Sequence, residues 1–196
     1  MGHRFSGNDR KPRAILAISS VSAAWLLMQI IHESGHVIGA LLSGGSVKRV
    51  VLVPWEFSRT DFSSNPAPLF ACWAGSILGV VIPLFLWGIA QSIARPTAFW
   101  FRFFAGFCGI ANGAYIAMGV LTGDGDGGDL LRHGSPTWVP IVFGVCSTTA
   151  GLAIWYKLGS NFGFGPHAQP VNWVKAIVAT SAFAVILFAE VITALI

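Results

Sequence analysis

A long run with a single charged side chain constrains the fold of this chain more than any other feature. Residues 14–42 contain one charged group, Glu33. Because a helix rises about 1.5 Å per residue, this run is long enough to cross a hydrocarbon core of roughly 30 Å with a turn or more to spare. The run therefore predicts a membrane-spanning helix.

Four further apolar runs resemble the first. Of the whole chain, 54% is hydrophobic and only 10% charged, whereas about a quarter of the residues of a soluble domain are charged. We therefore expect an all-α, multi-pass integral membrane protein with about five transmembrane helices. The four runs are residues 69–94, 99–120, 138–156 and 173–196.

The segment between the first two runs, residues 43–68, breaks the helical pattern. Gly44 and Gly45 end the first run, and residues 47–53 are rich in β-branched side chains. This composition predicts a short strand or β-hairpin lying against the membrane face. Such an edge could hold an extended substrate by strand addition, although an ordinary connecting loop is an equal alternative.

A metal-binding pattern, H-E-x-x-H, lies in the far half of the first run as His32-Glu33-Ser34-Gly35-His36. Two histidines four residues apart share one face of a helix and can bind one metal ion together. The intervening glutamate can then take a proton from a water that zinc has acidified. A chance match is disfavoured, because ionisable groups inside membrane segments are costly and usually functional.

A catalytic zinc needs three protein ligands, so a third must come from another segment. The third run ends in a glycine-rich stretch with three carboxylates, Asp124, Asp126 and Asp129. A calcium loop of the EF-hand type lacks its final glutamate, which leaves a solvated turn or a zinc ligand on unwound backbone that lines an enclosed cavity. His133 is an alternative ligand, although a surface histidine is the favoured interpretation.

Other small and polar residues in the runs indicate helix packing. Asn112 is favoured as a helix–helix hydrogen bond, with orientation of substrate backbone as the alternative, and Glu190 is expected at an interfacial helix end. The cysteines lack metal-ligand spacing and are expected to be small buried residues. Glycine pairs spaced for close packing are Gly35 with Gly39 and Gly75 with Gly79, and the cysteines are Cys72, Cys108 and Cys146.

The net charge of +4 does not indicate nucleic acid binding, because the basic residues flank the apolar runs and act as topology signals. Residues 1–13 are polar and basic and predict a disordered cytoplasmic tail. Five spans with the N-terminus inside would leave only Lys48, Arg49, Arg59 and Arg132 outside. In either orientation the first and third runs end on the same side, so the histidine pair and the aspartate segment can meet.

These motifs resemble the site-2 protease family of intramembrane zinc metalloproteases. Its members carry H-E-x-x-H in one transmembrane helix and an Asp-Gly motif two spans later, which Asp126-Gly127-Gly128 matches here. The resemblance implies one zinc ion per chain held by His32, His36 and Asp126, with Glu33 as general base. It covers the first three spans, and it implies a site toward the cytosol, whereas the charge distribution places the site near the outer face.

We therefore expect one polytopic membrane metalloprotease domain, residues 1–196, with a core at 14–136 and additional spans at 137–196. The predicted activity is zinc-dependent cleavage of a transmembrane protein substrate, and the lack of a sensor domain leaves regulation to a membrane partner or to prior cleavage of the substrate. The alternatives are a metal transporter or other non-proteolytic metal-binding protein, and an inert scaffold, which would not need Glu33. Five histidines are too few for a membrane di-iron oxygenase.

Overall fold

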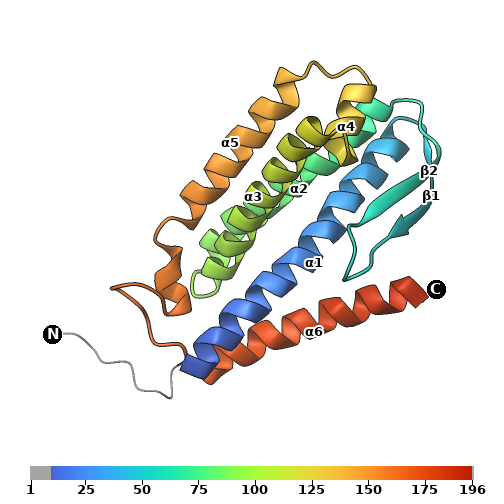
Figure 1. Ribbon diagram of the computed structural model, residues 1–196. Helices are drawn as coiled ribbons and strands as arrows, with labels where there is room; N and C mark the ends of the chain where they lie inside the picture. Colours follow the sequence, from blue (N-terminus) through green and yellow to red (C-terminus); the bar gives the residue numbers. More distant parts are fainter. Residues whose placement is uncertain (1–9, 196) are drawn as a thin grey trace.

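The computed structural model describes residues 10–195; residues 1–9 and 196 lie outside the described part. Within residues 10–195, five helices are long and apolar enough to cross a membrane, and a two-stranded antiparallel sheet follows the first (Figure 1). The prediction of an all-α membrane protein with about five spans and a hairpin is confirmed. The five helices are α1 (Arg10–Leu42), α2 (Pro68–Ile93), α3 (Ala98–Thr122), α5 (Trp138–Trp155) and α6 (Trp173–Leu195).

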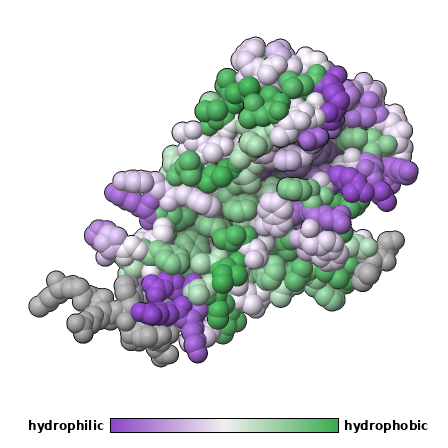
Figure 2. All heavy atoms as spheres, viewed as in Figure 1, coloured by the Kyte–Doolittle hydropathy of each residue, from purple (hydrophilic) through white to green (hydrophobic). Residues whose placement is uncertain are grey.

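Helix α1 begins at Arg10, so the expectation of disorder is wrong for residues 10–13; residues 1–9 are outside the described range. On the face shown in Figure 2, hydrophobic residues cover much of the middle, and hydrophilic ones gather near the hairpin and near the start of α1. Cys72 and Cys108 are buried as expected, but Cys146 is exposed on α5.

The hairpin consists of β1 (Ser46–Val51) and β2 (Arg59–Ser64) and lies alongside the second half of α1 (Figure 1). Gly44 ends α1 with φ of +79°, a conformation that glycine adopts without strain. Val50 then pairs with Thr60 across the sheet. The reversal places strand β2 against the face of α1 that carries the metal motif.

A short helix, α4 (Gly125–Arg132), follows α3 and was not predicted. Gly123, with φ of +78°, ends α3 and reverses the chain. A side chain at Gly127 would overlap the backbone of Ile116 and Val120 on α3. Glycine at this position therefore lets α4 lie directly against the last turns of α3.

Close backbone contacts hold the long helices together. A Cβ at Gly35 or Gly39 would meet the backbone of α2 within 3.0 Å, as expected for a small-residue packing pair. Helix α6 packs along the first half of α1, where the hydroxyls of Ser19 and Thr180 are 2.9 Å apart. Helices α1 and α3 end on the same side of the molecule (Figure 1). The metal-site prediction requires this arrangement.

Glu190 lies near the end of α6, and its side chain is only 2% exposed. Within the described residues neither of its carboxylate oxygens has a hydrogen-bond partner.

A short 3₁₀ helix, Leu158–Phe162, lies between α5 and α6 and was also not predicted.

Candidate metal centre

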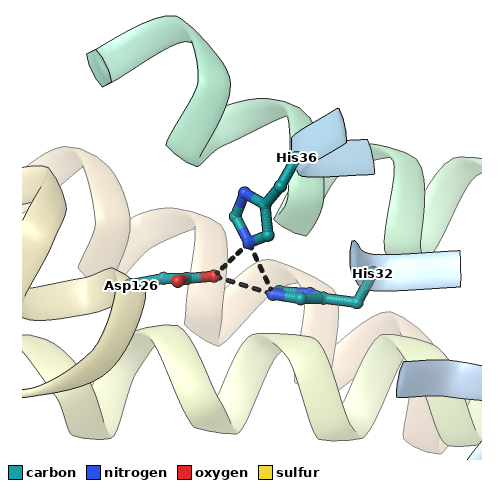
Figure 3. Close-up of side chains that lie close together, drawn as sticks. All are labelled: His32, His36 and Asp126. Atoms are coloured by element: carbon teal, nitrogen blue, oxygen red, sulfur yellow. Dashed lines mark hydrogen bonds and ion pairs between the residues drawn. The ribbon is translucent and has the colours of Figure 1, made fainter. Parts of the chain in front are cut away.

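The side chains of His32, His36 and Asp126 converge on one point between α1 and α4 (Figure 3). Asp126 Oδ2 lies 2.8 Å from His32 Nε2 and 3.1 Å from His36 Nε2, and the two Nε2 atoms are 3.0 Å apart. The spacing of the histidines on one helix puts them on a common face, and the fold of α4 brings the carboxylate to them from a distant part of the sequence.

The structure distinguishes among the candidate third ligands. Asp126 reaches the two imidazoles from the first turn of α4, which is helical and not unwound as expected. Asp124 is exposed, and Asp129 forms an ion pair with Arg132. His133 is exposed at the rim of a neighbouring cavity and does not join the cluster.

Hydrogen bonds to the far side of each imidazole set its tautomer. His32 Nδ1 is 2.7 Å from Asn112 Oδ1, and Asn112 Nδ2 donates to the Cys108 carbonyl, which fixes the orientation of the amide. His36 Nδ1 is 2.9 Å from the Ala71 carbonyl oxygen. Because both partners are acceptors, we assign both Nδ1 atoms as protonated, which leaves the Nε2 lone pairs directed at Asp126.

Three electron-pair donors that point at one buried place repel one another unless a cation lies among them. One shared proton can bridge only one pair, whereas a metal ion satisfies all three. A tetrahedral zinc with bonds of about 2.1 Å separates its ligand atoms by about 3.4 Å, a few tenths of an ångström more than the distances here. Two neutral imidazoles and one carboxylate are ligands that zinc accepts, so the residues fit this ion.

The Asp126 carboxyl has a strongly perturbed pKa. Burial alone would raise this pKa, but when protons occupy the site instead of a metal, hydrogen bonds from the Nε2–H groups and the positive charge of protonated His32 and His36 hold it well below its usual range. A bound metal ion would replace those protons and lower the pKa in the same way. Asp126 is therefore ionised at neutral pH, the state in which a carboxylate binds a metal.

Two glycines of α2 make room for this arrangement. A Cβ at Gly75 would overlap the imidazole of His36, and a Cβ at Gly79 would lie 2.7 Å from Asn112 Oδ1. The spacing of this pair predicted helix packing alone. Gly75 leaves space for the ligand His36, and Gly79 leaves space for Asn112, which orients His32. Such contacts around the ligands commonly tune metal affinity.

Glu33 is 2% exposed and faces the hairpin. Ser58 Oγ donates to its Oε1 and Thr60 Oγ1 donates to its Oε2, both at 2.7 Å. The backbone N–H of Ser58 also donates to Gln29 Oε1 at 3.0 Å. Each carboxylate oxygen has two lone pairs, so these hydroxyls orient the carboxylate and leave it able to accept a further proton.

Two cavities of about 290 Å³ each flank the cluster and share Glu33, Ser58 and Tyr115. One cavity is polar, is also lined by His36 and Asp126, and has room for several water molecules. The second is mostly apolar and opens between α1 and α3 beside His32. Its apolar lining consists of Trp25, Met28, Phe57, Ala111, Ala114 and Met118.

Sequence reasoning missed several residues that surround this centre. Asn112 forms the helix–helix hydrogen bond that was favoured for it, from α3 to α1, but the sequence did not show that its partner is a ligand histidine. Ser58, Thr60 and Tyr115 were not singled out, because hydroxyl residues in a connecting segment or one aromatic in an apolar span carry no periodic signal. Cys72, whose Sγ lies 3.5 Å from the Asp126 carbonyl oxygen, was likewise given no role.

The fold and the site together define a helical membrane protein with a buried candidate metal centre. A scan against protein-family models finds no match, and neither do comparisons with curated proteins and with solved structures.

Proposed function

We propose that this protein is an intramembrane zinc metalloendopeptidase. The observation that carries the proposal is the convergence of two oriented imidazole Nε2 atoms and one carboxylate, with Glu33 buried beside them. The order of the motifs along the chain and their resemblance to those of the site-2 protease family support the same activity.

A zinc ion held by His32, His36 and Asp126 would supply Lewis-acid polarisation of a scissile carbonyl and lower the pKa of a water. Glu33 lines the polar cavity with His36 and Asp126, which supports a role in taking a proton from the attacking water. Glu33 then delivers this proton to the leaving amide nitrogen. Ser58 and Thr60 hold the carboxylate in one orientation for both transfers.

The proposed substrate is a transmembrane segment of another protein. Its backbone must unwind locally, because helical hydrogen bonds shield its peptide bonds. The apolar cavity suits hydrophobic side chains near the scissile bond, and the polar cavity supplies water. Strand β2 lies beside the site through Thr60, so an extended substrate paired with the hairpin would pass close to Glu33.

Metal transport or passive metal binding is the alternative function. A transporter needs ligands along a path across the membrane. Within residues 10–195, His32, His36 and Asp126 form the only group of three or more side chains close enough to hold a metal ion. A single buried site next to an oriented carboxylate favours hydrolysis over transport.

The test compares Glu33→Gln with Glu56→Gln, a matched change at an exposed glutamate in the hairpin turn. Each variant is expressed in membranes, and new N-termini of membrane proteins are identified by mass spectrometry. We expect the wild type and Glu56→Gln to generate the same new termini and Glu33→Gln to generate none while retaining zinc. Equal cleavage by Glu33→Gln would refute the proposal.

A further inference from the structure

Tyr115 lies on α3 one turn beyond Asn112 and faces the metal centre. Its ring packs edge-on against His32, with 6.0 Å between the ring centroids. A Cβ at Gly125 would overlap the Tyr115 hydroxyl. The glycine before Asp126 therefore makes room for a hydroxyl group next to the third ligand.

Within the described residues, the hydroxyl of Tyr115 accepts one hydrogen bond but donates none. The Asp126 N–H points to it at 3.4 Å, and among residues 10–195 no group accepts the hydroxyl proton. Neighbouring donors are already engaged, because Ser58 and Thr60 donate to Glu33. Tyr115 also lines both cavities beside the cluster, as does Glu33.

We propose that Tyr115 is a further catalytic residue, which donates a hydrogen bond to the oxyanion formed from the scissile carbonyl. The inference rests on the proposed peptidase function. Water oxygen bonds to the carbonyl carbon, Glu33 takes one water proton, and the carbonyl electron pair moves to the oxygen that Tyr115 stabilises. When the C–N bond breaks, that electron pair re-forms the carbonyl and the proton on Glu33 passes to the amide nitrogen.

A donor directed at developing charge stabilises the transition state more than the substrate. The O–H of Tyr115 is suited to this role because no group in the described chain competes for its proton. A purely structural role would require only the ring, which packs against His32, and the weak contact with the Asp126 N–H.

Tyr115→Phe removes the hydroxyl and keeps the ring. The chain has two tyrosines, and Tyr156, exposed at the end of α5, provides the matched control Tyr156→Phe. Zinc content, cleavage rate and inhibitor binding are measured on the purified full chain. The binding probes are a leucine-based phosphinic pseudopeptide, which mimics the tetrahedral oxyanion, and acetohydroxamic acid, which binds zinc without that mimicry.

We expect Tyr115→Phe to keep its zinc, to lose about 10²- to 10³-fold in kcat, and to bind the phosphinic probe more weakly by a similar factor. Its affinity for acetohydroxamic acid should stay at the wild-type level, and Tyr156→Phe should match the wild type throughout. Wild-type cleavage by Tyr115→Phe, or an equal loss for both probes, would overturn the oxyanion role alone. A wild type that binds zinc but neither cleaves nor binds the phosphinic probe would overturn the peptidase function itself.

Discussion

Asn112 provides the most discriminating test of how the metal centre is built. Its Oδ1 accepts from His32 Nδ1 at 2.7 Å, and the residue is 1% exposed. Asn112→Leu keeps the volume but removes the acceptor, so the Nδ1–H of His32 loses its partner in a buried place. Leaving such a donor unpaired costs about 1–3 kcal/mol. If the cost falls on the metal-bound state, zinc affinity drops about 5- to 150-fold, in line with the effect of other groups that orient metal ligands.

The measurement is zinc affinity by competition with a fluorescent chelator in detergent. Ser147→Ala is the control, because Ser147 donates a buried hydrogen bond from α5 to the Gly109 carbonyl on α3 and touches no metal ligand. A helix–helix role for Asn112 would make both variants less stable and leave both zinc affinities alone. If Asn112→Leu bound zinc as tightly as Ser147→Ala, the assigned role in orienting His32 would be wrong.

Two further predictions concern α2 and the hairpin. Gly75→Ala places a methyl group where the His36 imidazole lies and should reduce bound zinc well below one per chain. Gly88→Ala, with open space around its Cβ, should leave the zinc content unchanged. Equal zinc contents in the two variants would contradict the packing described for Gly75. The Arg49 guanidinium beside Asp61 holds the pKa of that carboxyl below its usual 3.8. This pair therefore stabilises the hairpin above about pH 3.8 and loses its effect as the pH falls through the folded-state pKa. The NMR titration midpoint of Asp61 should lie below 3.8 and rise in Arg49→Met, and an unchanged midpoint would refute the pairing.

The sequence predicted the helical spans and the two-histidine motif because both depend on local pattern. A run without charge long enough to cross a bilayer has few alternatives, and an i, i+4 pair is adjacent on any helix. The hairpin followed from glycines and β-branched residues. Asp126 was chosen over Asp124 and Asp129 through the family resemblance, and the geometry now brings Asp126 to the histidines.

The remaining parts depend on how distant elements face one another. The rotation of α3 about its own axis decides which side chain of the neighbouring helix α1 Asn112 meets, and no sequence spacing determines that its partner is the ligand His32. The spacing of Gly75 and Gly79 in the sequence is the same whether the backbone of another helix or a side chain packs against them. Helix α4 was missed because its glycines favour a turn locally, whereas packing against α3 stabilises the helix.

Zinc stoichiometry of the purified chain tests the central assignment most directly. Elemental analysis compares the zinc content of the wild type with that of His32→Ala, Asp126→Ala and Asp129→Ala. Asp129→Ala is the control, because Asp129 pairs with Arg132 outside the cluster. We predict about one zinc per chain in the wild type and Asp129→Ala, and little zinc in the other two. A wild type without zinc, or an Asp126→Ala variant that retains it fully, would contradict the metal centre described here.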